Sequence, residues 1–160
     1  MLKSPLDKWR KFCRLTGQER SALACSALLL PLIALGLRLL GFRRLQVALA
    51  KVVPNHEPGL EGRSESRRGE VEVVVRMVAA ASREGLVHGN CLEQSLTLWW
   101  LLRRRDVPAQ LRIGVQKQGD QFQAHAWVEL AGAVLNDRDD AHQEYTAFAR
   151  DLGVLGMDMR

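Results

Sequence analysis

The residues of this sequence whose types and spacing could do chemistry are a cysteine, a histidine and an aspartate, in that order. Cys91 begins an apolar stretch, residues 91–102, that reads as a helix, and His125 and Asp137 lie in or beside downstream segments with strand character. A thiol in the first turn of a helix lies where unpaired backbone N–H groups and the helix dipole favour negative charge, so its thiolate forms more easily. Cys91 is therefore a candidate nucleophile, His125 a candidate base and Asp137 a candidate group to orient the imidazole.

The segments that carry His125 and Asp137 are predicted to form an antiparallel hairpin. Residues 121–130 and 133–135 are joined by a two-residue turn that contains a glycine, as such hairpins often need. Period-two alternation places His125 on the face opposite the more apolar one. A helix packed on this hairpin can bring Cys91 to one imidazole nitrogen while Asp137 holds the other.

Each of these residues has an ordinary structural explanation when it is taken alone. Cys91 could be an inert buried thiol, His125 a structural residue of an apolar strand, and Asp137 a turn residue. The three together, in this order and in segments that can converge, favour catalysis.

A zinc site is the competing interpretation, because His88, Cys91, His125 and Asp137 are all ligand types. No second close pair of ligands accompanies the His-x-x-Cys spacing, however. We therefore expect no metal and no other cofactor.

Several runs of this sequence, taken together, resemble a known family. The runs that carry the likeness are Cys-Leu-x-x-Ser-Leu, Leu-Leu-Arg-Arg-Arg-Asp-Val-Pro-Ala, Leu-Arg-Ile-Gly-Val, Ala-His-Ala-Trp-Val-Glu and Leu-Asn-Asp, between residues 91 and 137. Together they look like the transglutaminase-like cysteine peptidases that remove leaders in lasso peptide biosynthesis, the B2-type proteins. The likeness is close over residues 89–137 and looser in the basic and apolar N-terminal part. By this resemblance Cys91, His125 and Asp137 match the catalytic positions of the family.

The resemblance also implies a substrate and partners. The substrate would be a ribosomally made precursor peptide, presented by a leader-binding protein, and an ATP-dependent ring-closing cyclase would consume the freed amine. Fused members of the family carry a small sheet-bearing leader-recognition domain. The start of this chain reads as helical instead, so we expect a separate leader-binding partner.

Two parts of the expected site stay open. Related thiol peptidases often place a glutamine upstream of the nucleophile, but no glutamine lies between residue 51 and Cys91. The backbone N–H of Cys91 and the side chain of Asn90 are the nearest candidates for the oxyanion donors. Trp127 could bind substrate in a peptide groove, shield the ion pair, or simply pack.

Other classes of function fit the same residues. A transglutaminase-type acyltransferase would use an amine rather than water on the thioester, and a non-catalytic scaffold in a peptide-modifying complex would use neither. Only the resemblance favours the peptidase among these.

Composition sets broader bounds. A chain of 160 residues suits one domain with a short appended segment. The 23 Lys and Arg against 18 Asp and Glu give a net charge of +5, but the aromatics lack the setting of a base-stacking surface, so we do not expect nucleic-acid binding. Three widely spaced cysteines fit reduced thiols in a cytoplasmic protein.

The N-terminal region holds the most apolar stretch of the chain. Residues 1–20 alternate bases and apolar residues at helical spacing, residues 21–37 carry no charge, and residues 39–53 read as a short helix. The uncharged run would be roughly 25 Å long as a helix, which is short for a membrane span, and Pro31 weakens it. We expect it to pack on the protein core and on the leader-binding partner, with membrane contact as the alternative.

The sequence therefore predicts an α+β fold in which helices pack on a small antiparallel sheet of about residues 110–116, 122–130 and 133–135. We divide the chain into a helical N-terminal accessory region, 1–53, a linker, 54–68, and a transglutaminase-like or papain-like peptidase core, 69–160. A helix is expected over 69–83 and a weak helical stretch over 145–152. His142 is expected on the surface.

Overall fold

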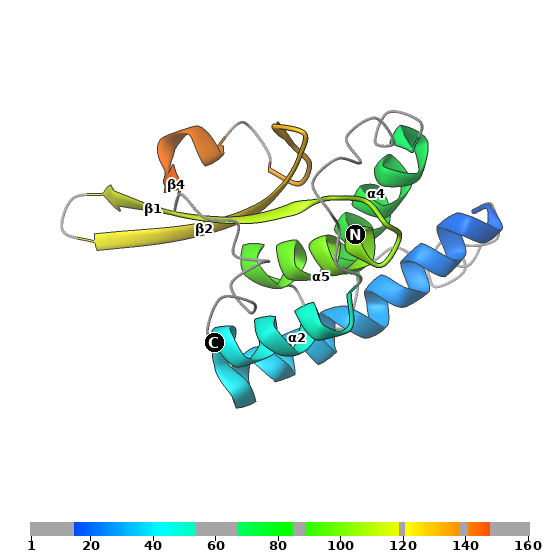
Figure 1. Ribbon diagram of the computed structural model, residues 1–160, viewed down its shortest axis with the longest axis horizontal. Coiled ribbons are helices and arrows are strands. Elements are labelled where there is room, and N and C mark those ends of the chain that lie inside the picture. Colours follow the sequence, from blue (N-terminus) through cyan, green and yellow to red (C-terminus); the bar gives the residue numbers. More distant parts are fainter. Residues whose placement is uncertain (1–14, 54–66, 85–88, 119–120, 138–140, 148–160) are drawn as a thin grey trace, which may run out of the picture.

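The computed structural model describes residues 15–53, 67–84, 89–118, 121–137 and 141–147. Within these ranges the chain forms three α-helices and a small antiparallel sheet, in agreement with the predicted α+β class (Figure 1). Most of the helix predicted over 1–20 and of the linker predicted over 54–68 lies outside the described residues, as does His88.

Helix α5, Cys91–Arg103, is the central helix of the structure and begins where the sequence predicts. Asn90 caps it: its side-chain oxygen accepts the N–H of Glu93 at 3.0 Å, and the Glu93 carboxylate accepts the N–H of Asn90 at 3.0 Å. This reciprocal capping box satisfies two of the backbone donors that the first turn leaves unpaired. The helix start, and with it Cys91, is therefore fixed by local sequence.

The sheet has four strands in the order β3-β2-β1-β4. Strands β1, Gln110–Gln118, and β2, Gln121–Leu130, form a long hairpin, and β3, Ala133–Val134, follows across the predicted turn. Both residues of that turn have positive φ, 50° at Ala131 and 79° at Gly132, which matches the twist of a tight antiparallel hairpin.

Strand β4, Thr146–Ala147, is a correction to the sequence prediction, which placed these residues in a weak helix over 145–152. They pair instead with Val115 and Gly114 at the edge of β1. A side chain at Gly114 would come within 2.8 Å of the Tyr145 Cβ and 2.9 Å of the Trp127 ring, so the glycine admits this close approach. The pairing depends on β1, and the local sequence does not reveal it.

Helix α2, Gly17–Lys51, contains a break at Gly41, where φ is 74° and ψ is 167°. The short helix predicted over 39–53 corresponds to the part after this break. Helix α4, Arg68–Glu84, agrees with the helix predicted over 69–83.

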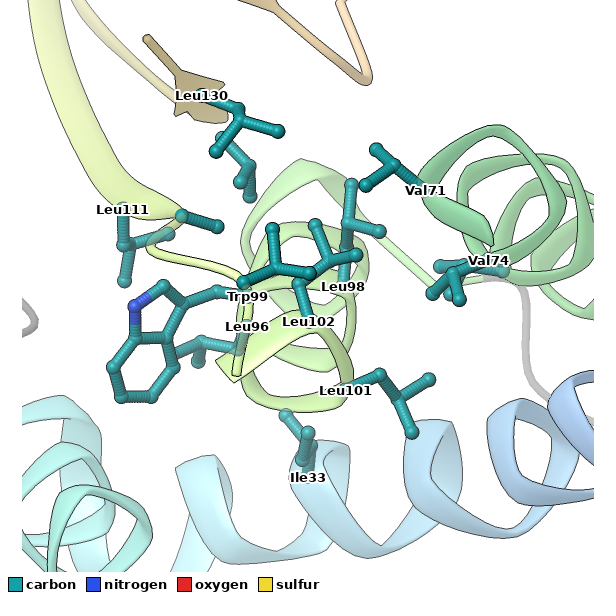
Figure 2. Packing of buried hydrophobic residues seen from close by; sticks show 14 of the residues in the cluster. Ile33, Val71, Val74, Leu96, Leu98, Trp99, Leu101, Leu102, Leu111 and Leu130 are labelled. Carbon is teal, nitrogen blue, oxygen red and sulfur yellow. The ribbon is translucent and has the colours of Figure 1, made fainter. Parts of the chain in front are cut away.

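The core joins all three helices to the sheet. Figure 2 shows α5 in the centre, with Leu101 facing Ile33 of α2, Val71 and Val74 of α4 on another side, and Leu111 and Leu130 towards the sheet. Helix α2 thus belongs to the same hydrophobic cluster as α4 and α5. The division into an accessory region and a core remains a prediction.

Candidate active site

One cavity of about 530 Å³ receives the three residues singled out by their chemistry. Cys91 comes from the start of α5, His125 from β2, and Asp137 from the segment after β3. The remaining wall is built by α4, α5, β2 and the segment after β3, and consists of Val75, Val78, Ala79, Arg83, Gln94, Leu98, Ala126, Leu135 and Asn136. Three separate segments of the chain therefore meet at one cavity.

His125 and Asp137 are hydrogen-bonded, with 3.0 Å between Nε2 and Oδ1. The Asp137 side chain is only 4% exposed, whereas that of His125 is 20% exposed. Cys91 is half-buried. Among the residues that the structure describes, no hydrogen bond joins its thiol to the imidazole. The structure thus brings His125 and Asp137 into contact, and brings Cys91 to the same cavity.

The charge of Asp137 determines which ring nitrogen of His125 carries the hydrogen. Burial raises the pKa of the Asp137 carboxyl, but hydrogen bonds from the backbone N–H of His142 and from the two histidine rings outweigh it, so the pKa is lowered overall. An ionised carboxylate only accepts hydrogen bonds, so Nε2 of His125 must carry the hydrogen. In the neutral ring Nδ1 is then unprotonated, as a base requires.

His142 is a functional candidate that sequence reasoning missed. It lies in the 3-10 helix Ala141–Glu144, and its ring Nδ1 is 2.9 Å from Oδ2 of Asp137. Its backbone N–H also donates to Oδ2. From the sequence His142 is expected on the surface; the 3-10 turn folds it back against Asp137, so its side chain is half-buried, at 22% exposed. No local pattern in the sequence signals this contact.

Trp127 covers both histidines. Its ring is stacked on His125 at 5.9 Å between centroids and tilted against His142 at 6.0 Å. The side chain is 2% exposed, and its indole N–H donates to Glu129 at 2.8 Å. Trp127 does not line the cavity. These contacts favour shielding and packing over binding in a peptide groove.

A buried polar network connects the three segments of the site. The Ser95 hydroxyl donates to the carbonyl of Ala126, the Asn136 amide donates to the Ser95 hydroxyl, and the N–H of Val128 donates to the Asn136 oxygen, each at 2.8 Å. Ser95 lies one turn after Cys91, and Asn136 directly precedes Asp137. The network therefore fixes the helix that begins at Cys91, the strand that carries His125 and the segment that carries Asp137 relative to one another.

Asn90, the predicted oxyanion donor, and Gln94 on the same helix are placed differently relative to the cavity. The Asn90 oxygen is engaged in the helix cap, and Asn90 does not line the cavity. Gln94, on the same helix, does line it, and its amide donates to the Gly89 carbonyl at 2.6 Å. Gln94 lies three residues downstream of Cys91, whereas related thiol peptidases often place a glutamine upstream of the nucleophile. The role of Asn90 remains a prediction.

No group of three or more His, Cys, Asp or Glu side chains is arranged to hold a metal ion in the part of the chain that the structure describes. His88, one member of the zinc interpretation, lies outside that part.

The chain is similar to known proteins at two levels, a family model and one relative. The model of the transglutaminase-like superfamily matches residues 32–150, which begins within α2. The microcin J25-processing protein McjB of Escherichia coli is 37% identical over 60 residues, or 38% of this chain and 28% of that protein. The match thus spans less than a third of that relative. No solved structure matches the chain significantly.

Proposed function

This chain belongs to the transglutaminase-like superfamily, and on that basis we propose that it is a cysteine peptidase that cleaves the leader from a ribosomally made precursor in lasso peptide maturation. The similarity to a microcin-processing protein supports the peptide-processing part of this proposal. The observation that carries the peptidase part is the bonded pair of His125 and Asp137 in the same cavity as Cys91.

In the proposed mechanism Nδ1 of His125 takes the proton of the Cys91 thiol. The thiolate attacks the carbonyl carbon at the end of the leader, the carbon–nitrogen bond breaks, and His125 returns the proton to the departing amine. Water then hydrolyses the thioester and restores the thiol. Asp137 stays ionised, holds the ring in this tautomer and stabilises the imidazolium. Such thiol-to-imidazole hydrogen bonds are often long before substrate binds.

The proposed partners follow from the resemblance to lasso peptide leader peptidases rather than from the contacts described above. They are the precursor peptide, a separate leader-binding protein that presents it, and an ATP-dependent cyclase that uses the new amine. We also propose that the chain acts in the cytoplasm, where thiols stay reduced.

The test uses the full chain with a lasso precursor peptide and a leader-binding protein. Cys91→Ala should abolish leader release, while Cys25→Ala, which removes an exposed thiol of α2, should not. Circular dichroism confirms that both variants are folded. Retained release by the Cys91→Ala protein contradicts the peptidase proposal.

Mass spectrometry of the leader separates hydrolysis from acyl transfer. A free carboxylic acid at its new end supports the peptidase. An amide formed with an added primary amine, at the expense of the acid, supports the acyltransferase alternative, whereas a folded protein that yields neither product is the scaffold.

A further inference from the structure

Helix α2 carries a stripe of exposed leucines. Leu28, Leu32, Leu35 and Leu39 are spaced by four, three and four residues, which places them on one face of a helix. The stripe and its neighbour are between 48% and 72% exposed: Leu28, Leu32, Leu35, Leu39 and Leu40. Surface leucines are ordinary when scattered singly, but a contiguous row marks an interaction site.

The other face of the same helix is packed on the protein. Ala22, Leu30, Ile33 and Ala34 are buried, and α2 contacts both α4 and α5. In Figure 1, α2 runs along one side of the molecule, with α5 and the sheet on its other side. The most apolar 18-residue window of α2 has a mean hydropathy of 2.2, yet only 22% of it is buried. A helix that served only the core would be mostly buried.

The charges on α2 indicate what the stripe contacts. Arg38 is exposed beside the end of the stripe, and Arg43 and Arg44 are exposed just after the break at Gly41. After Glu19 the helix contains no carboxylate. An anionic lipid surface complements both features, because acyl chains accept the leucines and phosphates accept the guanidinium groups. A second copy of this chain would bring the same cations and no carboxylate to the contact.

The packing of α2 also sets its orientation. The helix cannot cross a bilayer while Leu30 and Ile33 stay buried against α4 and α5. It can lie in the plane of the interface, with one face on the protein and the other on lipid. The stripe from Leu28 to Leu39 would then extend roughly 17 Å along the surface.

We propose that the leucine stripe of α2, with Arg38, Arg43 and Arg44, docks this protein on the surface of an anionic membrane. The docking is independent of the proposed peptidase activity, because none of these residues lines the cavity.

The experiment measures flotation of the full chain with phosphatidylcholine vesicles, with and without phosphatidylglycerol. The chain should bind the anionic vesicles, bind pure phosphatidylcholine at least about ten-fold more weakly, and be released by salt. The double variant Leu32→Gln with Leu39→Gln should lose at least about ten-fold in binding, and so should Arg43→Gln with Arg44→Gln.

Two single control variants make similar changes, from apolar to polar and from charged to neutral, elsewhere on the surface. Phe122→Gln removes an exposed apolar side chain from β2, and Lys117→Gln removes an exposed charge from β1. Both should bind vesicles like the unaltered chain. Thermal unfolding confirms that the variants are folded. The salt and lipid dependence is measured on the unaltered chain, so it tests the proposal even if a variant fails to fold.

Several outcomes would overturn the proposal. These are failure of the unaltered chain to float with anionic vesicles, equal binding to both lipids, or equal losses in the stripe and control variants. A lipid-free dimer that the leucine variant abolishes, without vesicle binding, would assign the stripe to a second copy of the chain.

Discussion

The carboxylate of Asp137 is bonded by His142 twice, through the ring Nδ1 at 2.9 Å and through the backbone N–H. The same carboxylate bonds His125 through its other oxygen. The ionised Asp137 carboxylate thus accepts hydrogen bonds from two imidazoles. By holding this carboxylate, His142 fixes the ring of His125 indirectly. Because His142 does not line the cavity, it acts on the proposed chemistry as a positioning residue.

The first prediction concerns His142→Ala. Loss of the ring bond should lower kcat roughly ten-fold, as expected for one hydrogen bond to a charged group, with KM unchanged. His142→Gln, which can still donate to the carboxylate, should recover much of the rate. The measurement is the pH profile of leader cleavage, and a change in KM alone would contradict a positioning role.

The direction of the pH effect follows from the pKa of Asp137. The ring of His142 is among the contacts that lower this pKa, so its removal should raise the pKa and move any acid limb due to Asp137 to higher pH. The folded protein gains stability from ionised Asp137 above its unfolded pKa, about 3.9, and loses it as pH falls through the lower folded pKa. Asp137→Asn should therefore destabilise the protein at pH 7 but have little effect in strong acid.

The second prediction is that His125 and Asp137 act as one unit with Cys91. His125→Ala should reduce cleavage severely, and adding Asp137→Ala should reduce it little further, since the orienting group has no imidazole left to hold. Rates of the single and double variants give the comparison. A multiplicative further loss in the double variant would show that Asp137 has a separate role.

Local signals account for the parts of this site that the sequence predicts. Asn90 and Glu93 form a capping box that starts the cysteine helix, and alternation across a turn that contains Gly132 gives the histidine hairpin. Strand β4 depends on pairing with the distant strand β1, and the His142 contact depends on the chain folding back onto Asp137. No periodicity encodes them, because they involve strands or turns of two to four residues.

Helix α2 shows a second limit of sequence reasoning. Residues 21–37 of α2 carry no charge, so no polar stripe reveals which face of this stretch meets the core. Ile33 and Leu32 are adjacent and chemically alike, yet one is 2% exposed and the other 61% exposed. Only the positions of α4 and α5 make that distinction.

The third prediction tests the network around Asn136. Asn136→Ala leaves the N–H of Val128 without its side-chain acceptor and the Ser95 hydroxyl without its donor, so unfolding free energy should fall by about 1 to 3 kcal/mol. Asn90→Ala, which removes a helix cap, should cost about 1 kcal/mol. Urea denaturation measures both. Unchanged stability of the Asn136 variant would mean that the network does not hold the segments together.

The last prediction compares the two faces of α2. Ile33→Ala should lower the unfolding free energy by about 2 to 5 kcal/mol because it opens a cavity opposite Leu101. Leu32→Ala, one position away, should change it by no more than about 0.5 kcal/mol.

The same packing predicts that a chain beginning at residue 54 exposes the core face of α5 and loses cooperative unfolding. If that shortened chain instead unfolds cooperatively at the temperature of the full chain, residues 1–53 are an accessory region after all, and the packing of α2 contributes nothing to the stability of the remaining core.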